Sequence, residues 1–225
     1  TQEEPRTIRK TVVLAALLSA PVFAAWPEIA SPPGARVESI GEQVRLNGIP
    51  MRMYSVVVER EANDVLAFYR AGLGPRLAEK NLGHDRILSQ ARGDHFITVR
   101  IRPLSPKRSL ALVAISDAKA ARQAAHRDPG YRLPANSALL SDMESVDAGK
   151  RSRQLVLQNR LGLKANQAAL TQQLAERGYR PSPQSYRSSN NSVVQLFDGD
   201  RREAQLVLVH QQGLTQIVLT TLQTP

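Results

Sequence analysis

Arginines that alternate along one short stretch are the side chains best placed to bind a ligand. Arg100 and Arg102 are separated by one residue, and residues two apart lie on the same face of a strand. Guanidinium groups bind phosphate or carboxylate oxygens in forked pairs of hydrogen bonds. The sequence therefore predicts a basic surface on a strand hairpin, joined by two arginines from further along the chain. The predicted binding residues are Arg100, Arg102, Lys107, Arg108, Arg151 and Arg153.

Two interpretations of this basic surface stay open. It could follow the phosphates of an anionic polymer or lipid (DNA, lipopolysaccharide or glycan strands), or it could be the polar outer face of a sheet. No aromatic residue interleaves with the arginines of the hairpin, so the stacking platform typical of single-strand binders is missing. The formal net charge of +10 favours anionic partners in general.

The sequence carries no recognisable catalytic motif. It has no cysteine, which excludes disulfides, thiolate zinc sites, iron–sulfur clusters and cysteine nucleophiles. Its four histidines are not spaced as metal ligands, and it has no nucleophile elbow, phosphate-binding glycine loop or dinucleotide fingerprint. We therefore expect no catalytic residues, no metal ligands and no cofactor.

The N-terminal segment has the features of an export signal. Arg6, Arg9 and Lys10 precede a mostly apolar run from 12 to 25, which is long enough for a signal-peptide core and short for a membrane span. Small residues precede Ala25, so we expect cleavage there and a periplasmic mature protein. Two alternatives remain: an uncleaved inner-membrane anchor with Trp26 at the membrane surface, and a buried helix of a cytosolic protein.

The residues after 35 alternate mainly with period two, which is typical of strands. Strands are expected over 36–44 and 51–59, joined through Asn47-Gly48, a strong hairpin signal. A helix capped by Asn63 should follow, and then strands over 87–91, 96–102 and 110–116. The apolar face expected for the helix consists of Val65, Leu66, Phe68, Tyr69 and Leu73.

The second half is expected to repeat this order. Ala165-Asn166 is expected to open a helix as Ala62-Asn63 does, with Leu170 and Leu174 as its apolar positions. The expected strands around it cover 143–146, 154–158, 186–188, 193–197, 205–210 and 214–222. The predicted fold class is α+β: two tandem β-rich repeats, each strand–strand–helix–three or four strands, with antiparallel sheets. The halves could form separate domains or join edge to edge into one sheet.

These patterns divide the chain into five parts. Residues 118–132 contain an alanine-rich stretch capped by Asp117 and then a turn, so they are expected to form a linker or short helix. The predicted parts are a signal peptide at 1–24, an extended linker at 25–34, a first α+β repeat at 35–117, this linker at 118–132 and a second α+β repeat at 133–225.

Two short motifs carry a family resemblance. Leu46–Met51 (LNGIPM) followed by Val65–Arg70 (VLAFYR) resembles a pattern in uncharacterised exported proteins of proteobacteria that are linked with envelope, pilus or secretion gene clusters. The resemblance implies an accessory role in envelope assembly and carries over no catalytic residue.

The sequence therefore predicts a non-enzymatic periplasmic binding or scaffold protein with an envelope protein as its partner. Exposed strand edges would bind that partner by strand addition. The alternative is a binder of anionic polymer or lipid. An enzyme would require an acid–base pair assembled only by the fold.

Overall fold

The computed structural model describes residues 26–124, 130–182 and 185–225. It is a β-rich α+β structure built mostly from antiparallel strands, which confirms the α+β class and the antiparallel sheets that the sequence predicted. The elements of the first half are β1 (Arg36–Ser39), β2 (Gln43–Leu46), β3 (Ile49–Val58), α1 (Ala62–Leu73), β4 (Ala78–Leu82), β5 (Asp85–Arg92), β6 (His95–Ser105), β7 (Arg108–Asp117) and α2 (Ala118–Ala124). Those of the second half are β8 (Ala138–Asp147), β9 (Lys150–Asn159), α3 (Leu163–Glu176), β10 (Arg180–Pro181), β11 (Arg187–Ser188), β12 (Ser192–Gly199), β13 (Arg202–Gln211) and β14 (Leu214–Gln223).

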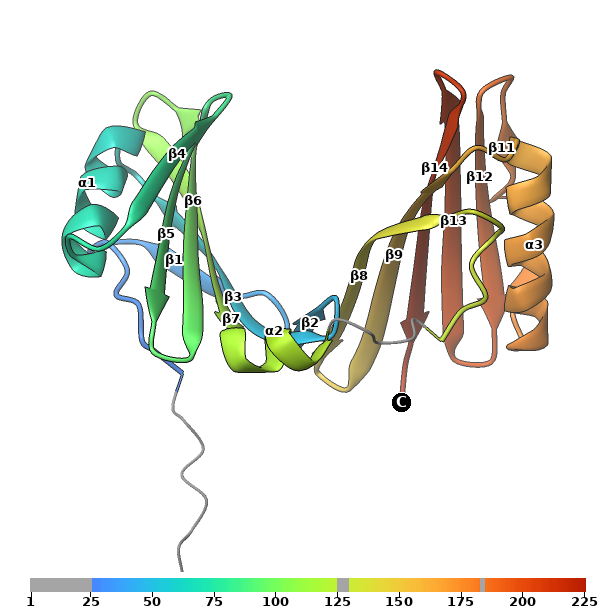
Figure 1. Cartoon of the computed structure of the whole chain (residues 1–225), viewed down its shortest axis with the longest axis horizontal. Coiled ribbons are helices and arrows are strands. Elements are labelled where there is room, and N and C mark those ends of the chain that lie inside the picture. The colour runs from blue at the N-terminus through green and yellow to red at the C-terminus, as the bar shows by residue number, and fades with distance from the viewer. Residues whose placement is uncertain (1–25, 125–129, 183–184) are drawn as a thin grey trace, which may run out of the picture.

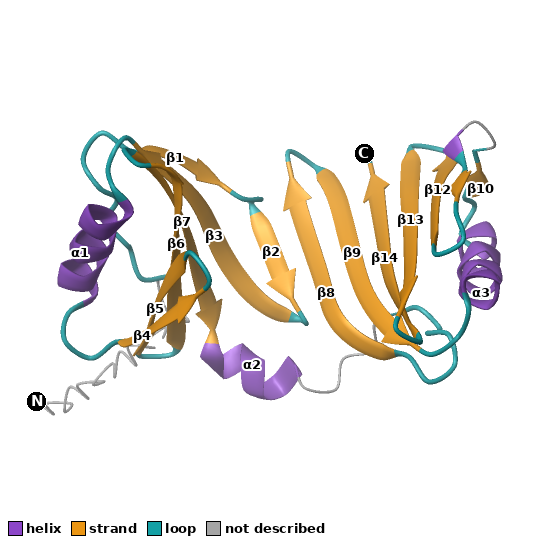
Figure 2. Ribbon diagram, turned by 90° about the horizontal axis from the view of Figure 1, so that it is seen from above, coloured by secondary structure: helices purple, strands orange, loops and turns teal. Residues whose placement is uncertain are grey.

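Both halves belong to one continuous sheet, joined where β2 pairs with β8 (Figures 1 and 2). Outward from this junction the first half runs β2-β3-β7-β6-β5-β4, and the second runs β8-β9-β14-β13-β12-β10. Short β1 and β11 pair with β3 and β12 beside this path. Of the two arrangements that the sequence left open, the structure has the shared sheet.

The junction is narrow and consists mainly of backbone hydrogen bonds. Its ladder matches 43–46 with 143–146 in antiparallel register. Next to it, the Asn47 backbone N–H donates to the Asp142 carbonyl (2.7 Å), and the Asn47 side-chain oxygen accepts from the Asp142 N–H (2.8 Å). Asn47 and Gly48 have φ of 51° and 78°, as a tight hairpin turn of this type requires. The predicted Asn-Gly turn therefore also fastens the two halves together.

The helices α1 and α3 cover opposite ends of the same sheet face. Figure 1 shows the two halves rising on either side of the junction, with α1 and α3 on the outside. The buried side of α1 is Val65, Leu66, Tyr69 and Leu73, as predicted except for Phe68, which is half-buried. The α3 helix buries Leu170 and Leu174, also as predicted. Each helix packs on its own apolar cluster, so each half has a separate core.

The predicted start of each helix is displaced. Glu61 precedes α1 in extended backbone and makes no side-chain cap, so Asn63 is not the cap. Gly162 precedes α3, and Asn166 lies inside the helix, completely buried. Val65 and Asn166 each lie three residues after the first residue of their helix. In the two helices, the position equivalent to Asn166 is therefore Val65 and not Asn63.

The segment expected as an extended linker before the first repeat is attached to the fold. From Trp26 onward it has no helix or strand, yet Trp26 and Ile29 pack against the first core. In contrast, α2 forms where an alanine-rich helix was predicted, and the Asp117 carboxylate accepts a hydrogen bond from the Ala120 N–H (2.8 Å), which confirms that cap.

Candidate functional site

The arginines of the predicted basic hairpin are largely engaged by carboxylates. Arg102 donates to both oxygens of Asp85 (2.9 and 3.0 Å), and Arg100 forms an ion pair with the same group. The Asp85 side chain is only 5% exposed. Hydrogen bonds from Arg102, followed by Arg100, lower the pKa of Asp85 from 3.8 to about 2, although burial opposes the shift. One of these two positive charges is therefore balanced within the sheet.

The remaining predicted residues lie apart. Arg108 pairs with exposed Glu59 (3.1 Å), and Lys107 lies in the turn between β6 and β7. Arg100 and Arg102 alternate with buried core residues and lie on the face opposite the helices, whereas Arg153 shares the helix-bearing face with Leu155 and Leu157. The sheet therefore does not bring the six predicted binding residues together on one surface.

The Asp85 cluster makes a prediction about acid stability. Because the folded pKa of Asp85 is depressed, its stabilisation is complete above the ordinary pKa and is lost as the pH falls from about 4 through about 2. Asp85→Asn should be less stable than the parent protein at pH 6, and this difference should close over that window. Urea unfolding at several pH values measures it. A difference that stays constant with pH would contradict the assignment, and Glu38→Gln at an exposed ion pair is the control.

Two cavities open on the helix-bearing side of the sheet: one in the first half, and one in the second half that extends across the junction to β2. The first, about 1010 Å³, is lined among others by Trp26, Arg52, His95 and Asp117. The Arg52 guanidinium lies 5.3 Å from the centre of the Trp26 ring, whose centroid is 5.0 Å from that of His95. His95 is 8% exposed and faces Asp117 across the β6–β7 ladder. The single tryptophan thus closes one side of this cavity.

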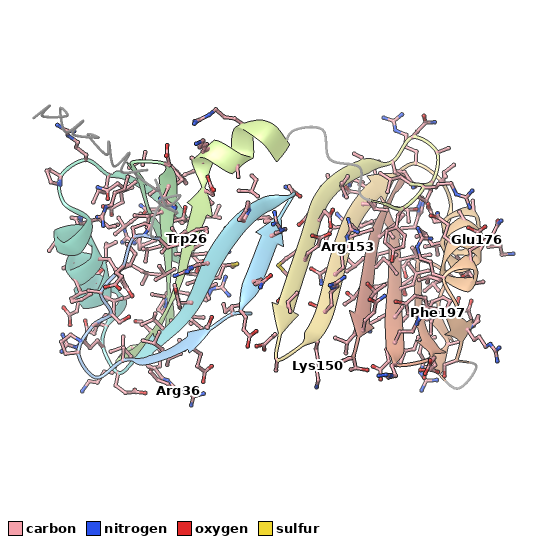
Figure 3. All side chains as sticks on the ribbon, turned by 90° about the horizontal axis from the view of Figure 1, so that it is seen from below. Trp26, Arg36, Lys150, Arg153, Glu176 and Phe197 are labelled. Atoms are coloured by element: carbon pink, nitrogen blue, oxygen red, sulfur yellow. The ribbon has the colours of Figure 1, made fainter. Side chains whose placement is uncertain are left out.

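The second cavity, about 580 Å³, is rich in arginine. Five arginines line it: Arg45, Arg151, Arg153, Arg177 and Arg202. Arg153 donates to both Asp142 oxygens (2.8 and 2.6 Å), which raises the pKa of Arg153. The Tyr131 ring lies 4.2 Å from the Arg177 guanidinium and 5.7 Å from that of Arg153. Burial raises the pKa of the Tyr131 hydroxyl. Figure 3 labels Arg153 in this half, beside the junction.

The two cavities occupy corresponding places in the strand order. Arg52 on β3 pairs with a residue of β7, and Arg153 on β9 pairs with a residue of β14. In each half, an aromatic residue from the segment ahead of the first strand, Trp26 or Tyr131, stacks on that arginine. A turn closed by a 3.1 Å backbone hydrogen bond to Pro32 or Pro134 follows each aromatic residue. Sequence analysis missed this motif, whose signal is an aromatic residue ahead of a proline turn.

Among the described lining residues of the two cavities, no acid and base are joined by a hydrogen bond as a catalytic pair would be. In the first, Asp117 is occupied in capping α2, and among the described residues no hydrogen bond joins His95 to a carboxylate. In the described ranges, no group of three His, Asp or Glu side chains is placed to hold a metal ion. The second cavity offers guanidinium donors, aromatic rings and one lining carboxylate, Glu144, which suits the binding of an anion.

Comparisons with known proteins give no family assignment. The chain matches no protein-family model, no curated protein and no solved structure. The resemblance to exported proteobacterial proteins therefore stays a prediction. The predicted signal peptide at 1–24 and its cleavage before Ala25 lie outside the described residues. Within the part of the chain that the structure describes, no helix has the length and apolar character needed to cross a membrane.

Proposed function

We propose that this chain is a non-enzymatic, exported binding and scaffold protein that serves an envelope assembly such as a pilus or secretion system. The observation that carries the proposal is a sheet that extends through both halves, with α1 and α3 packed on the same face. The other face, here called the inner face, is formed by side chains that alternate with the core residues of each strand. It includes Met53, Phe96, Thr98 and Leu112 in the first half and Val156, Gln205, Val207, Val209 and Val218 in the second.

We further infer that the halves are tandem repeats. Their strand orders correspond position by position outward from the junction, with α1 and α3 following β3 and β9 respectively. The aromatic–arginine pair and the proline turn recur at the matching places. Correspondence of both topology and detailed contacts supports duplication better than the weak sequence likeness between the halves does.

The chemistry of the inner face fits a segment of a partner protein. Phe96 is 43% exposed and Val209 is 36% exposed, and the second half adds uncharged Gln205 and Gln216. Aliphatic side chains bury apolar surface of a partner, and amides can pair with its backbone groups. Few charges lie on this face in the second half, so a polyanion has little to bind there.

Among the described residues, the longest edge available for strand addition is β4, one residue longer than β1, which pairs only with β3. All residues of β4 are exposed, and this strand pairs on one side with β5. At the other end of the sheet, β10 has two residues, one of them Pro181, which lacks a backbone N–H. A partner strand would therefore pair with β4, next to the first half of the inner face.

A pull-down from detergent-solubilised envelope tests the proposal. The protein from Ala25 onward should retain a defined protein partner at high salt. Binding through buried apolar surface depends less on salt concentration than binding through contacts between charges does. Phe96→Glu or Val209→Glu should reduce the captured partner about tenfold or more. Tyr186→Glu, an equally polar change at an exposed aromatic residue outside the strands, should leave capture unchanged.

The salt arm of the same experiment addresses the alternative. Recovery of only anionic lipid, glycan or nucleic acid, lost as salt rises, would overturn the scaffold proposal and favour the polyanion binder. The pairing of Arg100 and Arg102 with Asp85 gives that alternative less support than the sequence alone did.

A further inference from the structure

The arginine-rich cavity of the second half contains cations that no carboxylate balances. Within the described residues, Arg151, Arg177 and Arg202 have no carboxylate partner, whereas Arg153 is paired with Asp142 and lies 3.6 Å from Glu144, which also faces Arg45 across the β2–β8 ladder. The Arg151 side chain makes no hydrogen bond or ion pair with the described residues, so its guanidinium is free to bind a ligand. Three positive charges therefore line one cavity with their charge uncompensated.

Two of these arginines are held in place by neutral acceptors. Arg177 donates to the carbonyls of Gln173 (3.0 Å) and Gly130 (2.6 Å). Arg202 donates to the carbonyls of Asp200 (3.0 Å) and Arg177 (2.7 Å). Carbonyl acceptors fix the direction of a guanidinium without cancelling its charge. The cations are thus oriented before a ligand arrives, which lowers the cost of ordering them on binding.

The corresponding cavity of the first half has a different charge balance. Its lining carries three carboxylates (Glu28, Asp94 and Asp117) and two cations (Arg52 and Lys119), a formal balance of −1. The second cavity carries five arginines and one carboxylate, Glu144, a balance of +4. His95 on β6 occupies the position that Arg202 occupies on β13, at the matching end of the ladder. The accumulation of arginine is therefore specific to the second cavity, which takes Arg45 from β2 and its other four arginines from the second half.

We propose that this cavity binds a compact ligand with two or more oxyanion groups, of which a diphosphate is the simplest. Guanidinium groups bind such oxygens through paired, charge-assisted hydrogen bonds. Three uncompensated cations match the charge of a diphosphate more closely than that of a monoanion. A volume of about 580 Å³ lies in the range of small-molecule sites and leaves room for an organic group beyond the phosphates. This site is independent of the partner-binding role proposed for the inner face.

Titration calorimetry with sodium pyrophosphate, in metal-free buffer at physiological ionic strength, tests the site. Saturable binding with one ligand per chain is expected, and binding of tricarballylate, a carboxylate trianion, should be weaker. Arg151→Gln should weaken pyrophosphate binding about tenfold or more. This variant removes no internal hydrogen bond, so its fold should be intact. Arg202→Gln should have an effect of at least the same size.

Lys150→Gln is the matched control. Lys150 is exposed and is next to Arg151 on β9, so strand alternation places it on the other face of the sheet. Lys150→Gln and Arg151→Gln each remove one positive charge. The affinity of this variant should equal that of the parent protein. Equal weakening by Lys150→Gln and Arg151→Gln would overturn the proposal in favour of a diffuse charge effect. Absence of saturable binding would also overturn it, as would capture on phosphatidic acid vesicles without binding of soluble pyrophosphate.

Discussion

Asn166→Ala is expected to lower the free energy of unfolding by about 3 kcal/mol. The completely buried Asn166 amide donates to Asn159 Oδ1 (3.0 Å) and to the Leu161 carbonyl (3.0 Å), and its oxygen accepts from Asn159 Nδ2 (2.7 Å). Alanine leaves the Asn159 amide and a loop carbonyl without these partners in the interior. Urea unfolding followed by circular dichroism measures the change.

The control for Asn166 lies on the same helix. Lys164→Ala is at an exposed position of α3 and should alter the free energy of unfolding by less than about 0.5 kcal/mol. A loss below about 1 kcal/mol for Asn166→Ala would show that the amide pair does not hold the start of α3 against β9.

Phe197→Ala should be the most destabilising of these changes, by about 4 kcal/mol, because it leaves a cavity in the core of the second half. The Phe197 side chain is 1% exposed and packs in the cluster under α3. The two cores are separate and the halves meet through a ladder of four residue pairs. Unfolding of the variant should therefore split into two transitions, with the second half unfolding first.

Fluorescence of the single tryptophan follows unfolding of the first half, whereas circular dichroism follows the loss of secondary structure in both halves. Comparison of the two signals therefore separates the two transitions. Trp26 packs on the first core, so it should report the later step. Phe68→Ala, at a half-buried phenylalanine of α1, should cost less and should not destabilise the second half selectively. A single transition detected identically by both signals in Phe197→Ala would show that the junction couples the halves tightly.

Local patterns predicted most of the elements. Asn47-Gly48 predicted the hairpin because few residue pairs adopt two positive φ values, and helical periodicity predicted the buried faces of both helices. Exposed β4 has no apolar alternation, and its burial pattern is uniformly exposed, so period-two analysis could not find it. The start of β8 was missed for a related reason: a register shift between Leu139 and Ser141 interrupts the alternation.

The candidate sites were less accessible to sequence analysis because they depend on which face of the sheet each strand presents. Alternation placed Arg100 with Arg102, and Arg151 with Arg153, but the relation between the two pairs depends on strand register across the junction. Arg177 and Arg202 meet through a hydrogen bond to a backbone carbonyl, which no residue spacing signals. Asp85 could have been suspected from its position on the strand that precedes the arginines, yet its burial becomes apparent only in the folded sheet.

The junction between β2 and β8 has an evolutionary consequence. Its ladder is made by peptide groups, which every residue except proline supplies, so it makes few demands on side-chain identity. Substitutions in one half can therefore accumulate without loosening the attachment to the other. A chain built this way can carry two cavities with different linings, as His95 and Arg202 at matching positions of the two ladders illustrate.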